Sequence, residues 1–504
     1  MRVIILTLAI SIFLSLNVNA EETGSNEFKR TGWNAMVWQR FMHPPVFTFT
    51  PMDRAARYKC TLTWQDGANK HEVQIESKTP EINTVNVWKD LAPGDINAVV
   101  EALDGERKQI GQFQFNFKKI ASFSGPYRPA KCSYDESGAK AAMWVLEKAK
   151  DEKEVAFPTL FRTAYIRILI TYARLHPGTE TAVKALEAAI KHGEFLLEGS
   201  TPADWVYANM PMSHNNKDIL QVCRTGMAGM AYLDLFTATK DKKFSDAAFR
   251  IAETLKKTQL EDGRWYFRVQ SQSGELRENY TSDQAEAILF LDELIRNLFI
   301  WSPFADEPNK KEYIDTRDKA VKWMLENPCK TFQWQQQWDD VREMKPYENL
   351  EWFDTGLFIE YLLRYATPEN GYEKIAVNLF NYIEDQFVEW EPSGNAITPG
   401  VREQYCCYSA MDWHTVHYIR ACMAFYSRTK DDIYLKKAKA MADTLTVIQH
   451  QAGFYPTGME HKPSKDNPSE LNEINYNGIW VNCTSYAGEM MMKLEEFLKK
   501  EDIK

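Results

Sequence analysis

The chain of 504 residues has few cysteines, and none of them forms a zinc-type CxxC pair. Eight scattered cysteines are too few for a disulfide scaffold, and the missing spacing argues against a structural zinc site. The sequence also lacks a Walker loop, an HExxH pair, a GxSxG turn and a dinucleotide-binding glycine fingerprint. It therefore gives no support to the common nucleotide-binding, zinc-protease and serine-hydrolase classes.

Long apolar runs are absent after the first twenty residues. Residues 1–20 begin with the basic Arg2, continue with VIILTLAISIFLSL and end in the small-residue motif Val18-Asn19-Ala20. This pattern predicts a secretory signal peptide that is removed after Ala20. Because no second long apolar run follows, we expect a secreted or periplasmic protein with no membrane span.

Positive charge is in deficit, and the formal net charge is -10. This balance argues against nucleic acid as the main partner. It still allows an anionic substrate, because a local basic cleft can form on an acidic protein.

Aromatic residues are abundant, at 13% of the chain with 15 tryptophans and 23 tyrosines. Exposed rings suit a carbohydrate-binding cleft, since the apolar face of a sugar stacks on them. The alternative is that these rings fill a large helical core.

The pattern between about Pro45 and Ile120 alternates between apolar and polar residues. Runs such as YKCTLTW, HEVQIES, NTVNVW and QFQFNF predict short strands, and together a small antiparallel β-sandwich module over 21–125. The segment LAPGDINAVVEALDGERKQIGQF resembles the later strands of fibronectin type III-like domains, with Ile96 at the usual tyrosine position. Residues 122–129, with a glycine and two prolines, are typical of a linker.

From about Tyr134 the apolar residues recur with helical spacing, and we assign residues 126–504 to a mainly α catalytic domain. The expected helices are 135–152, 158–176, 178–197, 217–239, 243–258, 281–302, 310–326, 351–366, 369–388, 405–428, 430–447 and 482–500. Such regularly joined helices predict a ring of helical hairpins, an (α/α) toroid of six or seven hairpins. The alternative, an α-solenoid, would show a stricter sequence repeat.

The segment 203–218 contains the consecutive polar residues His214, Asn215 and Asn216, just before a helix expected from about Lys217. Asn215 or Asn216 would be the N-cap of that helix in the simplest interpretation. That interpretation leaves His214 without a structural purpose.

The segment 400–417, GVREQYCCYSAMDWHTVH, combines a turn signal with Arg402, Tyr405 and Tyr408. A guanidinium beside a phenol lowers the phenol's pKa and makes it a usable proton acceptor. The alternative is that both tyrosines are ordinary half-buried helix residues. His414 and His417 have the spacing for a shared metal, but core or supporting roles are favoured, so we predict no metal site and no cofactor.

Three further loops supply candidate substrate-binding residues. They are 268–283, 332–356 and 454–462, and the candidates are Arg268, Tyr280, Trp338, Tyr347, Trp352, Tyr455 and His461. Tyr405 of the segment 400–417 is a further substrate-binding candidate, and the reserve for the role of Tyr408. The polar residues of 268–283 have an alternative, structural interpretation, in which Ser282 and Glu286 form a capping pair at a helix start.

Together, the HNN motif at 214–216 and the R402-x5-Y408 spacing resemble the active sites of (α/α)-toroid polysaccharide lyases. The Arg-to-Tyr spacing is similar to that of the alginate- and glucuronan-cleaving polysaccharide lyase family 38. The resemblance implies β-elimination on an anionic uronate polysaccharide. Asn215 or Asn216 would neutralise the substrate carboxylate with support from His214, Tyr408 would be the general acid and base, and Arg402 would activate it.

Three other classes remain open. A glycoside hydrolase acting on uronides would need two carboxylates, and its candidates are Asp283, Glu348, Glu351, Asp354, Glu403 and Asp412. A uronate C5-epimerase would abstract the same proton as a lyase. A non-catalytic glycan-binding protein is the third class.

Overall fold

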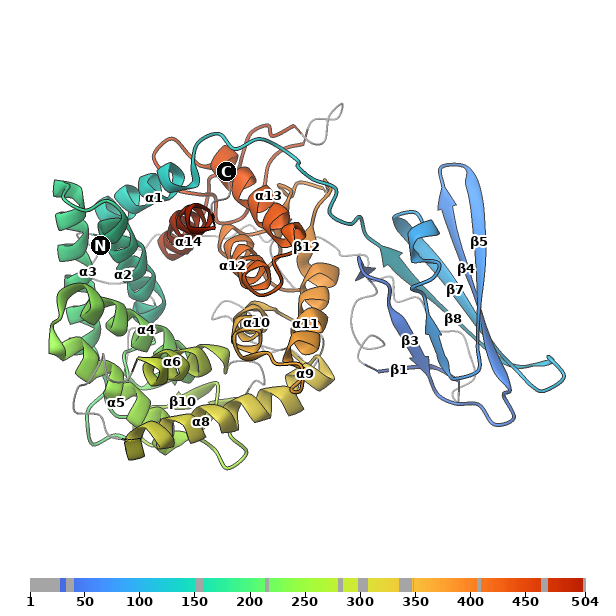
Figure 1. Ribbon diagram of the computed structural model, residues 1–504, viewed down its shortest axis with the longest axis horizontal. Coiled ribbons are helices and arrows are strands. Elements are labelled where there is room, and N and C mark those ends of the chain that lie inside the picture. The colour runs from blue at the N-terminus through green and yellow to red at the C-terminus, as the bar shows by residue number, and fades with distance from the viewer. Residues whose placement is uncertain are drawn as a thin grey trace, which may run out of the picture. The chain divides into compact units, whose positions relative to one another are not determined.

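The computed structural model describes residues 28–32, 40–149, 157–213, 217–279, 284–297, 307–334, 347, 349–392, 394–405, 409–463 and 470–501. The chain divides into two compact units, Met1–Ile120 and Ala121–Lys504. The first unit is built from β-strands and the second from helices (Figure 1).

The first unit contains two sheets. One has the strand order β1-β3-β6, with β1 at Arg30–Thr31, β3 at Val46–Phe49 and β6 at Glu81–Asn83. The other has the order β2-β8-β7-β4-β5. Its strands are β2 (Arg40–Phe41), β8 (Gln109–Lys119), β7 (Gly94–Leu103), β4 (Arg57–Asp66) and β5 (Asn69–Ser77). The short pairing of β2 with β8 is parallel, and the long neighbours are antiparallel.

The core of this unit comes from alternating residues. Phe113, Phe115 and Phe117 of β8 are buried, as the two-residue period of a strand requires. They meet the other sheet through Phe47, whose ring centroid is 4.9 Å from that of Phe115. The strand expected at NTVNVW is wrong beyond Asn83. The chain turns at Thr84 and forms a short 3-10 helix, η2 (Trp88–Asp90), whose Trp88 indole N–H donates to the Met42 carbonyl.

The second unit is a closed double ring of helices (Figure 1). Among the described residues, each inner helix packs on the next, and the last one packs on the first. The inner helices are α2 (Pro158–Leu175), α4 (Val222–Thr239), α6 (Ala285–Arg296), α10 (Phe353–Tyr365), α12 (Asp412–Thr429) and α14 (Val481–Lys500). This arrangement confirms the predicted toroid, with six inner–outer pairs.

The outer helices alternate with the inner ones along the chain. They are α1 (Tyr134–Ala149), α3 (Glu180–Glu198), α5 (Lys242–Thr258), α8 (Glu307–Glu326), α11 (Tyr372–Phe387) and α13 (Asp432–Ile448), with the short α9 (Pro328–Thr331) after α8. Helix α5 buries only one face, which carries Phe244, Ile251 and Leu255. The inner α10 is buried almost all round, as expected of a helix between two layers.

Two close approaches hold the ring together. A Cβ added at Gly226 of α4 would lie 2.6 Å from the Glu286 carbonyl oxygen of α6. A Cβ at Gly138 of α1 would lie 2.5 Å from the Gly488 carbonyl oxygen of α14. The second contact joins the first and last helices of the ring, so the ring closes only because glycines let these two backbones meet.

Three of the expected helix starts are four or more residues too early. Helix α6, expected from 281 with Ser282 as its cap, begins at Ala285 with Gln284 as the N-cap residue. Helix α4 begins at Val222, because Ile219–Gln221 forms strand β9 against β10 (Arg268–Gln270), which also pairs with β11 (Leu276–Glu278). Gln221 is therefore the N-cap residue, and the predicted capping role of Asn215 or Asn216 is corrected. Helix α12 begins at Asp412, because the preceding chain pairs with other loops.

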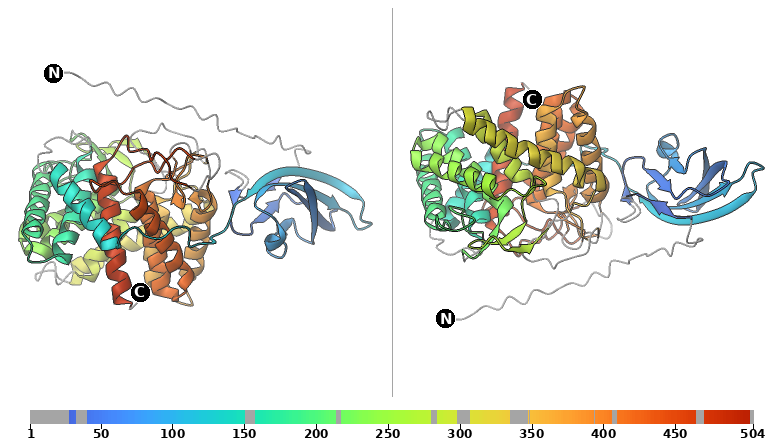
Figure 2. Two further views of the ribbon diagram at one scale, coloured as in Figure 1. Left: turned by 90° about the horizontal axis from the view of Figure 1, so that it is seen from above. Right: turned by 90° about the horizontal axis from the view of Figure 1, so that it is seen from below.

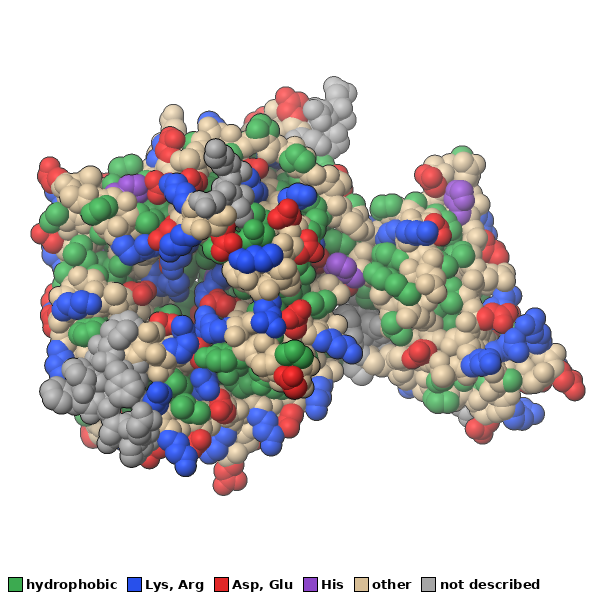
Figure 3. All heavy atoms as spheres, in the orientation of Figure 1, with side chains coloured by type: hydrophobic (Ala, Val, Ile, Leu, Met, Phe, Trp, Pro, Cys, Tyr) green, Lys and Arg blue, Asp and Glu red, His purple; other side chains and the backbone are tan. Residues whose placement is uncertain are grey.

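Charged side chains gather around the hollowed centre of the ring at the end shown in Figure 3. On α14, Glu489 accepts from Arg167 of α2 at 3.0 Å and from Lys493 at 2.5 Å. On α6, Asp292 is fully buried and pairs with Arg317 of α8 and Arg364 of α10. These pairs link neighbouring helices of the ring by charge.

No helix in the described part of the chain has the length and apolar character needed to cross a membrane.

Candidate functional site

All inner helices begin at the same end of the ring, because inner and outer helices alternate along the chain; Figure 2 shows the ring from the side. We call this end the mouth. The segments that lead to it are long: 199–221, 259–284, 327–352, 388–411 and 449–480. At the opposite end the connections are short, for example 240–241 and 430–431. Every loop predicted to carry chemistry therefore leads to the mouth.

The segment before α12 forms a hairpin. Strands β12 (Val388–Glu389) and β13 (Gly400–Val401) pair, and Arg402 then forms an antiparallel bridge with Ala410. The hairpin is fixed to the loop before α10, since the Trp352 indole N–H donates to the Arg402 carbonyl at 2.7 Å. The Tyr405 N–H donates to the Leu350 carbonyl at 3.1 Å. The structure thus joins two of the loops that the sequence singled out separately.

Arg402 and Tyr405 are half-buried on this hairpin. The Tyr405 hydroxyl donates to the Gln386 side chain at 2.8 Å, and its ring packs on Phe387. Tyr405 is therefore held in place by the end of α11. Tyr408, the predicted general acid and base, lies outside the described residues.

His214, Asn215 and Asn216 also lie outside the described residues, but the chain on both sides of them is described. Ser213 is fully buried, and its hydroxyl accepts from the Gln221 N–H at 2.9 Å. This bond anchors the segment at the start of α4. Since α4 and α12 are three places apart in a ring of six, their leading segments approach the mouth from opposite sides.

The predicted substrate-binding residues divide into three groups. Trp352 and Tyr455 are fully buried and His461 is nearly so, so none of them offers a ring face to a ligand in this structure. Tyr347 and Arg268 are half-buried; Tyr347 donates to the Thr331 carbonyl and Arg268 pairs with Glu278. Tyr280 and Trp338 lie outside the described residues.

Two candidate carboxylates serve the backbone. Glu351 is fully buried, and its Oε2 accepts from the Phe353 N–H at the start of α10. Asp354 is also fully buried, and its Oδ1 accepts from the Ala285 N–H at the start of α6. Both groups satisfy N–H donors that helix starts leave open. Asp283 and Glu348 lie outside the described residues.

The other two carboxylates lie close to the start of α12. Glu403 is nearly fully buried, and its Oε1 is 3.3 Å from His414 Nε2. Asp412 is fully buried, its Oδ1 accepts from the Trp413 N–H at 2.7 Å, and its Oδ2 has no hydrogen-bond partner among the described residues. Burial raises the pKa of Asp412 well above the usual value, despite that hydrogen bond.

His417 lies one turn along α12 from Trp413 and accepts a hydrogen bond from its indole N–H. Burial holds the pKa of His417 well below its usual value, and Arg420 adds to the effect. It is therefore a neutral core residue, as the sequence favoured. Among the described residues, no group of three or more His, Cys, Asp and Glu side chains could hold a metal ion.

Two residues at the start of α14 were missed by the sequence analysis. Trp480 is 39% exposed, whereas nearly all other described tryptophans of the ring are buried or half-buried, and its ring lies beside Phe161 of α2. Asn482 is fully buried, and its side-chain amide forms no hydrogen bond within the part of the chain that the structure describes. The sequence does show a tryptophan directly before an expected helix. Nothing in the sequence alone distinguishes this exposed tryptophan from the tryptophans that are buried in the core.

Comparison with known proteins gives a fold and no family. No family model matches the chain, and no curated protein matches it either. Among solved structures, a family 76 glycoside hydrolase (mannosidase) from Bacteroides thetaiotaomicron is 13% identical, with a TM-score of 0.50, covering 73% of this chain and 99% of its own. A D-mannose isomerase is 14% identical, with a TM-score of 0.50, covering 75% and 100%.

A polysaccharide lyase is also similar, at 11% identity and a TM-score of 0.45, covering 94% of this chain and 65% of its own. Identities this low establish the shared fold alone. The two matches at a TM-score of 0.50 extend over nearly the whole of each neighbour. The helical unit is accordingly an (α/α) toroid.

Proposed function

We propose that the protein is a secreted polysaccharide lyase that cleaves a uronate polysaccharide, of the alginate or glucuronan type, by β-elimination. The observation that carries this proposal is the opposed arrangement at the mouth. The hairpin with Arg402 and Tyr405 leads in from the α12 side, and the segment anchored by Ser213 leads in from the α4 side. A polymer lying across the mouth would contact both.

The proposed reaction removes the C5 proton of a uronate and expels the O4 of the next sugar. Asn215 or Asn216, supported by His214, stabilises the carboxylate as it becomes enolate-like. Tyr408, as phenolate, takes the C5 proton and then protonates the leaving O4. Arg402 favours the phenolate by its charge. The C4–O4 bond breaks, a C4–C5 double bond forms, and no cofactor is needed.

The described carboxylates give less support to a hydrolase. Hydrolysis needs two carboxylates on either side of a glycosidic bond. Glu351, Asp354 and Asp412 are each fully buried and each bonds a backbone N–H at a helix start. Carboxylates that are buried and already bonded to the backbone are poorly placed to act as acid, base or nucleophile on a glycosidic bond.

Two further assignments belong to the same proposal. The first unit is a fibronectin III-like module over about 21–125, supported by its two sheets with the orders β1-β3-β6 and β2-β8-β7-β4-β5. Residues 1–20 are a signal peptide, so the mature enzyme acts outside the cytoplasm on an anionic polysaccharide.

The test is incubation of the purified protein with alginate, glucuronan, heparan and chondroitin while ultraviolet absorbance is followed. A lyase produces absorbance from the new C4–C5 double bond together with new reducing ends. New reducing ends without absorbance would identify a hydrolase. Exchange of the C5 proton with solvent deuterium, without chain cleavage, would identify an epimerase. Binding without any reaction would identify a glycan-binding protein.

A further inference from the structure

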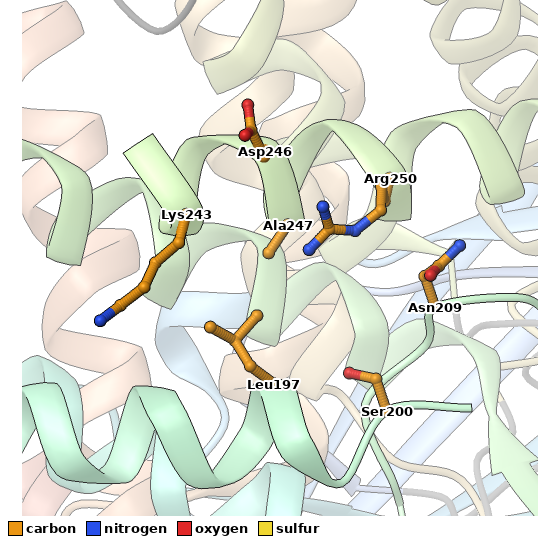
Figure 4. Close-up of a pocket in the computed structure, with 7 residues that line it drawn as sticks. All are labelled: Leu197, Ser200, Asn209, Lys243, Asp246, Ala247 and Arg250. Atoms are coloured by element: carbon orange, nitrogen blue, oxygen red, sulfur yellow. The ribbon is translucent and has the colours of Figure 1, made fainter. Parts of the chain in front are cut away.

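A pocket of about 360 Å³ lies between the outer helices α3 and α5, beside the loop that follows α3 (Figure 4). The apolar side chains of Leu197 and Ala247 form part of its lining. Ser200, Asn209 and Arg250 add a hydroxyl, an amide and a guanidinium. An apolar surface with a few polar groups around it suits a small polar ligand with one apolar face.

Arg250 is the available cation of this pocket. In the described part of the chain its guanidinium forms no hydrogen bond and no ion pair, and in Figure 4 it points back over Ala247. Lys243 also lines the pocket, but it pairs with Glu194 at 2.7 Å and Asp241 at 3.0 Å. The Asp246 carboxylate on the rim points away and pairs with Lys242.

Asn209 lies at the pocket on a loop that hydrogen bonds from Thr201 hold in place. Thr201 is buried, and its hydroxyl donates to the Tyr207 carbonyl and accepts from the Met210 N–H. The Asn209 N–H donates to the Thr201 carbonyl, and Asn209 has a left-handed φ of 58°. Asparagine accepts this conformation better than most side chains, and its amide is not used by any described residue.

A buried hydroxyl lies behind Ser200. Tyr232 of α4 is 1% exposed, and its hydroxyl has no hydrogen-bond partner in the described part of the chain. It faces the Ser200 hydroxyl without the geometry of a hydrogen bond. Tyr232 is not part of the pocket lining, so it bears on a ligand only through Ser200, whose hydroxyl donates to the Leu196 carbonyl at 3.0 Å and can still accept a hydrogen bond.

We propose that this pocket binds a carboxylate-bearing sugar unit, so that the polysaccharide has a second attachment site on the outside of the ring. The choice of a uronate rests on the proposed function. Arg250 takes the carboxylate, since a guanidinium fork fits a carboxylate with two hydrogen bonds. Asn209 and Ser200 take ring hydroxyls, and the apolar sugar face lies on Leu197 and Ala247.

The experiment observes the methyl groups of Leu197 and Ala247 by NMR in the full-length protein, labelled at these positions. Sodium glucuronate is the probe and glucose its neutral counterpart. Glucuronate should shift both methyl signals, and glucose should not. Arg250→Ala should weaken the response about tenfold or more, because a charged hydrogen-bonded contact is lost. Arg428→Ala, which removes an arginine from the end of α12, is the matched control and should leave it unchanged.

Equal titrations for Arg250→Ala and the unaltered protein, or equal responses to glucose and glucuronate, would overturn the inference. The result is separable from the proposed function. If polysaccharide is cleaved but these methyl signals do not respond, only the pocket assignment fails. If no substrate is cleaved but glucuronate moves the signals through Arg250, only the lyase assignment fails. If both hold, Arg250→Ala should weaken binding of long polymer while cleavage of a trisaccharide stays normal.

Discussion

The hydroxyl of Tyr408 is the smallest group that the proposed mechanism cannot lose. Tyr408→Phe keeps the ring and removes only that oxygen. We expect turnover to fall by roughly 10²–10⁴-fold, as general acid–base steps contribute, with the melting temperature unchanged. Elimination rate and thermal unfolding should be measured on the same samples.

Two variants on the same hairpin serve as controls for this prediction. Tyr405→Phe loses the hydrogen bond to Gln386, so it should change stability slightly and turnover little. Arg402→Lys keeps the charge and should cost less activity than Arg402→Ala. Full activity in both Tyr408→Phe and Tyr405→Phe would exclude a tyrosine mechanism and favour the hydrolase.

The exposed ring of Trp480 makes a second residue-scale prediction. Trp480→Ala should raise KM by about 2- to 10-fold, the worth of one aromatic contact, with kcat little changed. The Trp480 N–H donates to the Thr457 hydroxyl through the backbone, so the substitution leaves that bond in place. Val183→Ala, at an exposed apolar residue of the outer helix α3, is the control. A rise in KM equal in both variants would remove Trp480 from the site.

At the scale of elements, the helices of the toroid and most of their starts could be predicted from the sequence, but the starts of α4, α6 and α12 could not. Apolar spacing located α4 and α12 within expected helices, but these began at 217 and 405, earlier than Val222 and Asp412. In both cases the chain before the helix pairs with a distant loop, β9 with β10 and Met411 with Gly458. Such pairings depend on tertiary contacts that a local pattern does not contain.

The contact between α4 and α6 gives a prediction at the same scale. Gly226→Ala adds a methyl group 2.6 Å from the Glu286 carbonyl oxygen, where backbone would have to move. We expect a loss of about 1–3 kcal/mol in the free energy of unfolding, measured by urea denaturation. Gly178→Ala, in a turn with open space around a Cβ but a φ of 82°, separates backbone strain from crowding. A larger loss at Gly178 than at Gly226 would contradict the packing argument.

For the whole molecule, charge pairs across the ring predict a pH dependence. Burial alone would raise the pKa of Glu489, but Arg167 and Lys493 outweigh it and hold the pKa at about 2. A carboxylate with a lowered folded-state pKa adds stability above its usual pKa near 4.5, and this stability is lost as pH falls toward 2. Glu489→Gln should cost roughly 3–5 kcal/mol at pH 7, because two cations lose their buried partner.

The measurement is the free energy of unfolding at several pH values between 7 and 3. The difference between Glu489→Gln and the unaltered protein should shrink as the pH falls. Lys184→Ala breaks the pair with Glu180, which is fully exposed to solvent, and should leave the free energy of unfolding nearly unchanged at every pH. A difference for Glu489→Gln that stays constant with pH would show that its effect is packing rather than charge.

The chemistry assigned to the candidate site stays a prediction, and the sequence could not say where its loops lie. The polar residues at 214–216 and 402–408 suggest a reaction, yet nearly two hundred residues separate them. The described segments before α4 and α12 lead to opposite sides of one mouth because of the positions of these helices in a closed ring, which has no strict sequence repeat. Trp352, chosen as a platform, is instead the buried link between two loops, because its indole N–H bonds the Arg402 carbonyl.

The contact between α1 and α14, which closes the ring, has a consequence for the order in which the helices assemble. During translation α1 is the first helix of the ring to be made and α14 the last. The contact between Gly138 and Gly488 can therefore form only when the chain is almost complete. Until then α2 lacks its neighbour and Arg167 lacks Glu489. A chain that ends before its last twenty or so residues would therefore present an open ring with an exposed apolar edge, a form that is prone to aggregation and open to proteolysis.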